Sequence, residues 1–184
     1  MANTFVHLGT ATVGQEGATV LQFTSIPQNF TDLVVKISVR GMSYWTNETR
    51  IRFNNTSGGT SYNTRYLING AGTASSSYFD NTSSHFFSYV TPGQSYIMSE
   101  RTFGNHELYI PNYSGSKNKT FFIDAAGENG DTSYNVYAYS GFAAATWNSS
   151  AAITSIQIDA STAYSVPFRH NVFTRASLYG ISKS

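Results

Sequence analysis

The chain has 184 residues, a formal net charge of +1 and no cysteine. The lack of cysteine excludes disulfides, thiolate metal ligands and cysteine nucleophiles. The Lys and Arg residues number 11 and are scattered, which argues against electrostatic steering toward nucleic acid. A chain of this length suits one folded domain, so we predict a single domain over residues 1–184 with no nucleic-acid partner.

The composition indicates a folded β-protein. Charged residues make up 11% and aromatic residues 15% of the chain, whereas a disordered chain has more charge and few aromatics. The 13 Tyr and 13 Phe residues supply apolar side chains for a core. Thr, Tyr, Phe, Val and Ile favour strands, while the abundant Ser, Asn and Gly favour the turns between them.

Period-two alternation marks the strands. In the segment 33–40 every second residue from Leu33 to Val39 is apolar, and Lys36 and Ser38 lie on the opposite face together with Val34. This pattern predicts a half-buried strand. The segment Thr49–Asn54 repeats this pattern. The pair Asn54 and Asn55 at its end predicts a turn.

In chain order the predicted strands are Phe5–Thr12, Ala18–Thr24, Leu33–Arg40, Thr49–Asn54, His85–Val90, His106–Ile110, Thr120–Ala126, Tyr134–Ala143, Ile153–Asp159 and Ser177–Ile181. About ten short strands with turn residues between them favour an all-β antiparallel sandwich of the jelly-roll-like kind. The Ser-, Gly- and Asn-rich segment 56–84 predicts a long surface insertion with a short strand at Tyr66–Ile68. In the last strand we expect Leu178 and Gly180 on one face and Tyr179 and Ile181 on the other.

The residues that usually carry chemistry form no recognisable site. The four histidines are His7, His85, His106 and His170, and no two of them have metal-ligand spacing. The ten carboxylates are Glu16, Asp32, Glu48, Asp80, Glu100, Glu107, Asp124, Glu128, Asp131 and Asp159. We expect them to be solvated surface acids, although a sequence does not exclude the convergence of two carboxylates that a glycosidase needs.

The sequence contains no clear calcium-binding, nucleophile or phosphate-binding motif. The acidic segment 124–131 could supply oxygen ligands to calcium, but its spacing does not match an EF-hand and a plain loop is the simpler interpretation. There is no Gly-x-Ser-x-Gly elbow and no Gly-rich phosphate loop. We predict no catalytic, cofactor-binding or metal-binding residues, and a protein that is not an enzyme.

Several aromatic residues are predicted in loops, namely Tyr44, Trp45, Tyr96 and Trp147. Such side chains stack on sugar rings, fill a partner's pocket or cap the ends of a sandwich core. Because the chain has so few charges, a large protein–protein contact is favoured over a ligand pocket.

The chain shows no targeting segment. Its first residues lack a basic stretch followed by an apolar run. No stretch approaches the ~18 apolar residues that a membrane-spanning helix needs. We expect a protein made in a cytosol and not inserted into a membrane.

Four features carry a resemblance. They are the segment Val20–Lys36; the segment Ile51–Asn54 followed by Tyr62–Leu67; the segment Leu108–Ser114 followed by Lys119–Asp124; and the segment Ala151–Ile158 with the terminal run Ala176–Ile181. In this order they resemble a widespread set of phage and prophage virion proteins, over almost the whole chain. The resemblance implies a jelly-roll-like domain used as a capsid decoration (cement) protein or as the head of a fibre or spike, with no enzyme activity.

In fibre proteins of this kind the domain follows a long N-terminal shaft, whereas here the first strand is predicted within a few residues of Met1. This difference favours a decoration protein that stabilises the shell through contacts with the major capsid protein and with copies of itself. By analogy we expect a homo-oligomer, a homotrimer, located in the virion after synthesis in the host cytoplasm. The alternative is the receptor-binding head of a tail fibre or spike that recognises host surface glycans through Tyr44, Trp45 or Trp147.

Overall fold

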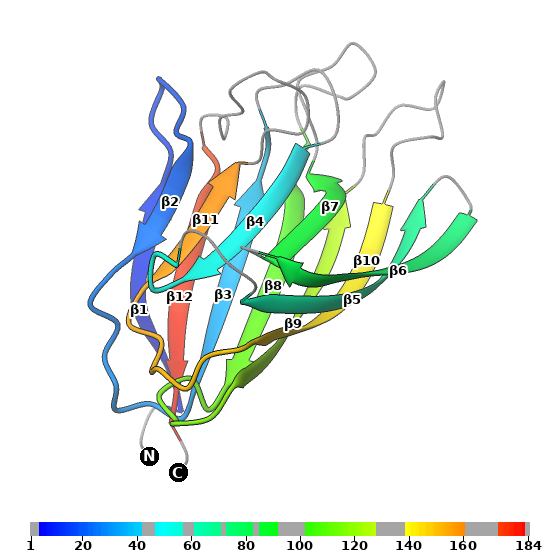
Figure 1. The fold of residues 1–184 in the computed structure, drawn as a ribbon. Coiled ribbons are helices and arrows are strands. Elements are labelled where there is room, and N and C mark those ends of the chain that lie inside the picture. The colour runs from blue at the N-terminus through cyan, green and yellow to red at the C-terminus, as the bar shows by residue number, and fades with distance from the viewer. Residues whose placement is uncertain are drawn as a thin grey trace.

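A computed structural model describes residues 4–41, 47–56, 61–70, 73–82, 85–91, 102–127, 139–160 and 173–182. The regular elements in these ranges are twelve strands in two packed sheets (Figure 1). The larger sheet has eight strands in the order β1-β12-β3-β8-β9-β10-β5-β6, and the smaller has four in the order β2-β11-β4-β7. All neighbouring strands are antiparallel.

The strands have the following bounds: β1 Phe5–Thr12, β2 Val20–Phe23, β3 Asp32–Val39, β4 Asn47–Phe53, β5 Tyr62–Gly70, β6 Thr73–Thr82, β7 His85–Thr91, β8 Gly104–Pro111, β9 Lys119–Gly127, β10 Tyr139–Trp147, β11 Ile156–Ala160 and β12 Arg175–Ile181.

The strand pairing is nested. The first strand pairs with the last, β2 with β11, β3 with β8 and β4 with β7. Successive members of this nest alternate between the two sheets, which is the wrapping of an eight-stranded jelly roll. The remaining strands form two inserted pairs, β5 with β6 and β9 with β10, and both extend the larger sheet. The predicted all-β, jelly-roll-like antiparallel sandwich is therefore confirmed.

All ten predicted strands overlap observed ones, with boundaries shifted by a few residues. The region 134–138 of one prediction lies outside the described residues. The segment 56–84 contains two full strands, β5 and β6, and the sequence pattern missed β6 altogether. Its residues Ala74 to Tyr78 are all exposed, so this strand is formed by pairing with β5 and lacks the buried face that produces alternation.

The core lies between the sheets and is centred on aromatic rings. Phe53 of β4 packs edge-on against Phe121 of β9, with 5.0 Å between ring centroids, and against Trp147 of β10 at 5.5 Å. Trp147 was predicted in a loop, where it could bind sugar or cap the end of the core. The loop placement is wrong, because the residue ends β10. Its 1% exposure agrees with the core alternative and not with sugar stacking. Every second residue of β10 from Ala143 to Trp147 is buried. Trp147 is the last of these inward-facing residues, so its ring lies in the core.

A buried tyrosine ties the inserted strand β5 to this core. Tyr62 is fully buried, and its hydroxyl accepts a hydrogen bond from the Phe53 backbone N–H at 2.8 Å. Its ring lies 6.0 Å from that of Phe53. The β5–β6 insertion is therefore anchored to the core at one end.

The closing strand β12 has the predicted facing. Leu178 and Gly180 are buried on the core side. A Cβ atom added at Gly180 would lie 2.5 Å from Cγ of Phe30. The ring of Phe30 thus occupies the space of the missing side chain, which explains why a glycine ends this buried face.

We expect Gly180→Ala to lower the free energy of unfolding by about 1–3 kcal/mol, the usual cost of overpacking. Chemical denaturation would measure it. The matched control is Gly9→Ala, since a Cβ there has nothing within 4 Å. In a Phe30→Ala background the cost of Gly180→Ala should shrink; an unchanged cost would show that the Phe30 contact is not its source.

The predicted turn after β4 is present. Its residue Asn54 forms hydrogen bonds with the backbone of the segment that precedes β11. Asn54 and Asn55 both have φ of 52°, a left-handed conformation that Asn tolerates well. The Asn54 Nδ2 donates to the Ala152 carbonyl at 2.7 Å. Its Oδ1 accepts from the backbone N–H groups of Thr154 at 2.8 Å and Ser155 at 3.1 Å.

We expect Asn54→Ala to destabilise the protein by about 1–3 kcal/mol more than Asn55→Ala, because it leaves several backbone groups without partners. Both substitutions meet the same backbone strain, so their difference isolates the hydrogen bonds. Asn55 accepts one bond from the exposed Gln22 side chain. Equal unfolding midpoints for the two variants would contradict this role of Asn54.

Candidate interaction surface

The outer face of the larger sheet carries a row of aromatic residues. Backbone register places His7, Tyr179, Val34, Tyr109 and Phe122 directly opposite one another on five neighbouring strands. Val34 was predicted on the polar side of its strand, yet it is only 3% exposed. It lies in register between two tyrosines, which accounts for its burial.

Ring contacts connect this row to its neighbours. Phe5 stacks on Tyr179 with 4.6 Å between centroids, Tyr109 lies 5.0 Å from Phe122, and Phe122 lies 6.0 Å from Phe142. We call the five residues with these ring contacts the aromatic band: Phe5, Tyr179, Tyr109, Phe122 and Phe142. Phe5, Phe122 and Phe142 are 46%, 40% and 46% exposed. Exposed apolar groups gathered in this way mark interaction sites more often than isolated ones do.

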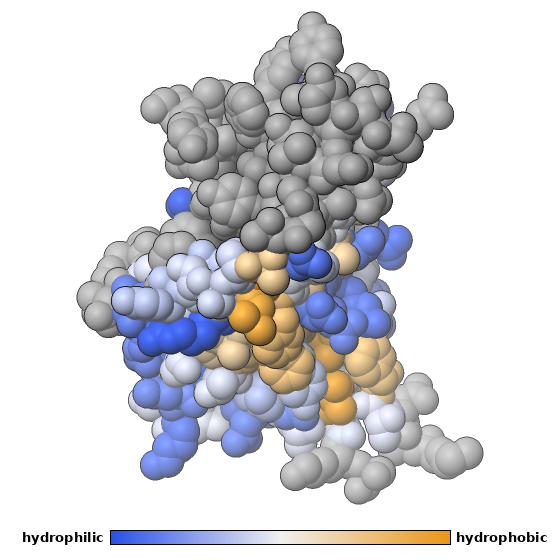
Figure 2. Space-filling model, turned by 90° about the vertical axis from the view of Figure 1, so that its right-hand side faces the viewer, coloured by the Kyte–Doolittle hydropathy of each residue, from blue (hydrophilic) through white to orange (hydrophobic). Residues whose placement is uncertain are grey.

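The apolar surface continues along β5. Leu67 is 61% exposed and lies opposite Phe142 in the register of β5 and β10. Viewed from the side of Figure 1 where β5, β6 and β10 lie, apolar side chains form a patch with hydrophilic side chains on either side (Figure 2). The larger sheet therefore offers an apolar surface across several strands.

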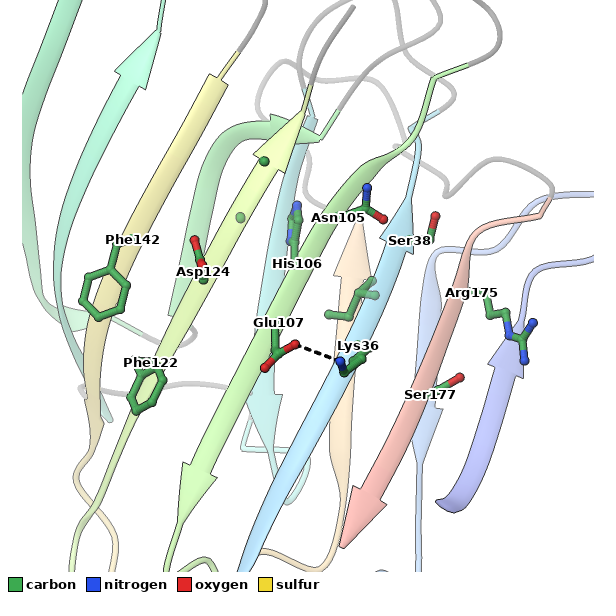
Figure 3. Close-up of a pocket in the computed structure, with 13 residues that line it drawn as sticks. Lys36, Ser38, Asn105, His106, Glu107, Phe122, Asp124, Phe142, Arg175 and Ser177 are labelled. Carbon is green, nitrogen blue, oxygen red and sulfur yellow. Dashed lines mark ion pairs between the residues drawn. The ribbon is translucent and has the colours of Figure 1, made fainter. Parts of the chain in front are cut away.

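A shallow depression of about 650 Å³ lies beside the band, over β12, β3, β8, β9 and β10 (Figure 3). Its polar side chains include Asp124, Asn105 and the ion pair of Lys36 with Glu107, whose Nζ and Oε2 atoms are 3.2 Å apart. Both partners of this pair are more than half exposed, so the pair contributes little to stability, about 0–1 kcal/mol. Phe142 and Asp124 also line a second depression of about 510 Å³ that reaches β5 and β6.

Asp32 fixes one tyrosine of the band. Its carboxylate accepts from the Tyr109 hydroxyl at 2.7 Å and from the Asn112 backbone N–H at 2.9 Å. The hydrogen bond to Asp32 raises the pKa of the Tyr109 phenol, and desolvation by burial adds to the effect. A phenol held neutral in the folded state stabilises the fold below its ordinary pKa of 10.0. That stabilisation is lost as the pH rises through the folded value.

We expect Asp32→Ala to bring the pKa of Tyr109 back toward 10.0, because it removes both the hydrogen bond and the negative charge that raise this pKa. NMR titration of ¹³C-labelled tyrosine would measure this. The same substitution should leave the pKa of Tyr62 unchanged, since burial is its main cause. A Tyr109 pKa that does not move would contradict the assignment.

The histidines considered as metal ligands lie on different strands in the described part of the chain. His7 is on β1, where its ring bonds to the Thr10 hydroxyl at 2.9 Å. His106 is buried on β8 and lines the larger depression. The side chain of His85 and the whole of His170 lie outside what the structure describes. The described residues contain no group of three His, Asp or Glu side chains able to hold a metal ion.

Among the described acids, Asp159 departs from the predicted solvated state. It is 5% exposed and bonds to Arg52 at 2.5 Å across β11 and β4. Burial raises its pKa, and the charge of Arg52 opposes that rise. The expectation of a surface acid is wrong here because Asp159 has a cationic partner on the adjacent strand, which lowers the cost of burying a carboxylate.

The other described acids follow the expectation more closely. Glu107 and Asp124 are exposed and lie opposite each other on β8 and β9. Asp80 is bound by Arg65 at 2.7 Å. The acidic segment 124–131 does not begin as a loop, since Asp124 is within β9. The remaining part of it from residue 128 lies outside the described residues, as do Tyr44, Trp45, Tyr96 and Glu100.

Comparison with models of known protein families and with curated proteins gives no match for this chain. In the part of the chain that the structure describes, no helix is long and apolar enough to cross a membrane.

Proposed function

We propose that this protein is a structural component of a bacteriophage particle, a decoration (cement) protein that stabilises the capsid through protein–protein contacts. The fold supports this proposal, because jelly rolls recur in viral capsid proteins. They also occur in lectins and cupins, and a fold does not imply a function. The observation that carries the proposal is therefore the exposed aromatic band on the outer face of the larger sheet.

The band has the features of a protein-binding surface. It is built on five strands of one sheet, so its rings are held on a rigid support. Aromatic residues are enriched in the buried centres of protein interfaces, and charged residues are depleted there. The ion pair of Lys36 with Glu107, which lies beside the band, suits the polar rim. Contact with a major capsid protein would remove Phe122 and Phe142 from water, and repetition over a symmetric shell would multiply a modest affinity.

Cryo-electron microscopy of the intact particle tests the assignment. We expect many symmetry-related copies on the head, with the outer face of the larger sheet against the shell. A few copies confined to the tail would refute the decoration role.

A binding assay tests the surface. The double variant Phe122→Ser/Phe142→Ser should bind at least tenfold more weakly to capsids that lack the protein, because two exposed rings of the contact surface are lost. Phe173→Ser is the matched control: this residue is 72% exposed but lies in the turn before β12, away from the band. Co-sedimentation with capsids would measure both. Equal losses in the two variants would contradict docking through the band.

A receptor-binding role is the second candidate, and one observation favours it. Phe122 and Phe142 stand beside Asp124 and Asn105 around the larger depression. Aromatic rings pack on the apolar face of a sugar, while carboxylates and amides bond to its hydroxyls. This version places a glycan on the sheet face and no longer involves Trp147. Binding of the purified protein to host polysaccharide, lost in Asp124→Ala but retained in Phe173→Ser, would favour this role over capsid decoration.

A further inference from the structure

The strand β6 ends the larger sheet. Among the described strands it has one hydrogen-bonded neighbour, β5. Its residues from Ala74 to Tyr78 are each exposed, so side chains on both faces of the strand reach solvent. Figure 1 shows β5 and β6 reaching beyond the neighbouring strands on the right-hand side. Within the residues that the structure describes, one row of β6 backbone N–H and C=O groups therefore faces away from β5 and is available to another strand.

This edge lacks the usual protection. Natural proteins block long edge strands with Lys, Pro, bulges or very short length. Here the ladder between β5 and β6 runs without interruption from Thr73 to Phe79, and the only irregularity lies beyond Phe79. The sequence 73–79 is Thr-Ala-Ser-Ser-Ser-Tyr-Phe, with no charge and no proline.

Among the described residues, the charges next to this segment on β5 and β6 are paired with each other. Asp80 accepts from Arg65 at 2.7 Å, and the guanidinium of Arg65 also lies 4.9 Å from the centre of the Tyr78 ring. Two copies of the segment 73–79 could therefore approach each other without placing like charges opposite one another. An unprotected, uncharged strand edge is what a second strand of the same sequence requires.

We propose that β6 is a self-association edge: two copies of the chain pair their β6 strands antiparallel about a two-fold axis at Ser76. Ser76 is the middle residue of the regular ladder 73–79. A two-fold contact of this kind is isologous, with the same patch on both copies. The larger sheets of the two copies then continue into one another.

Side-chain sizes fit this register. With Ser76 opposite its own counterpart, Tyr78 of each copy lies opposite Ala74 of the other, and Ser75 opposite Ser77. Tyr78 is 64% exposed in the single chain, and Ala74 leaves room for its ring. Ala74, Ser76 and Tyr78 share the outer face because they pair with Asn69, Leu67 and Arg65 of β5. A large residue against a small one on the same face is a favourable cross-strand pair.

The contact concerns the purified chain alone and does not rest on the proposed role in a virion. It is separate from docking through the aromatic band, whose five residues lie on β1, β12, β8, β9 and β10. A two-fold contact also differs from the homotrimer expected by analogy, since it joins copies in pairs.

Single-cysteine cross-linking tests the register, because the chain has no cysteine of its own. Directly opposed residues have Cβ atoms about 4.5–5.5 Å apart, and diagonal neighbours are about 7–8 Å apart. Under mild oxidation Ser76→Cys should therefore form disulfide-linked dimers at least tenfold faster than Ser75→Cys, whose counterpart lies on the diagonal. Ser140→Cys, exposed on β10, measures random collision. Cross-linking of Ser76→Cys no faster than that of Ser140→Cys, or slower than that of Ser75→Cys, would overturn the proposal.

Sedimentation velocity tests the edge without cysteine. The wild-type chain should show a dimer fraction that rises with concentration, and Tyr78→Lys should abolish it by adding charge to both sides of the contact. Ser140→Lys adds the same charge at an exposed position on β10, two strands away from β6, and should leave the dimer fraction unchanged. Circular dichroism would establish that both variants are folded. A wild-type chain that stays monomeric, or a dimer that Tyr78→Lys does not weaken, would refute pairing through β6.

Discussion

The packing of Phe53 against rings from the opposite sheet is the contact on which the rest of the structure depends. Phe53 belongs to the four-stranded sheet, while its partners Phe121, Trp147 and Tyr62 belong to the eight-stranded one. Edge-on aromatic pairs contribute about 0.5–1.5 kcal/mol each beyond the area they bury. This cluster holds together strands from the central jelly roll and from both inserted pairs.

That packing also explains why the outer face is available for function. Alternate residues of each strand must point inward to fill the core, so the residues between them point outward. On β9, Phe121 points into the core and Phe122 to the outside, 0% and 40% exposed respectively. Antiparallel register then aligns outward residues of neighbouring strands into a row. An aromatic surface arises in this way from residues far apart in the chain.

The two inserted pairs give the protein its distinctive surfaces. The pair β9–β10 supplies Phe122 and Phe142, and the pair β5–β6 supplies the free edge. Eight nested strands alone would carry only Phe5, Tyr179 and Tyr109 of the band and would lack the β6 edge. The proposed capsid and glycan contacts thus combine jelly-roll strands with the added pair β9–β10, whereas the proposed contact with a second copy lies on β6 alone.

Period-two patterning predicted most strands and the inward face of β3, where Leu33, Val35 and Val39 are all fully buried. Local pattern was sufficient there because burial on one face imposes alternation on the sequence. It was not sufficient for β6, which is exposed on both faces and exists through pairing with β5. Trp147 was misplaced for a related reason: its position at the end of β10 is visible only once the partners of that strand are known.

The amino-acid sequence alone therefore established an all-β chain, the alternation of its strands and the shared face of Leu178 and Gly180 in the last strand, because these depend on residues close together in the chain. Tertiary structure was needed for everything that depends on residues far apart. Asp159 is buried because Arg52 lies beside it, and Phe122 belongs to a band because Tyr109 and Phe142 occupy adjacent strands. Strand order and register, which set these neighbours, are determined by the packing of the whole chain.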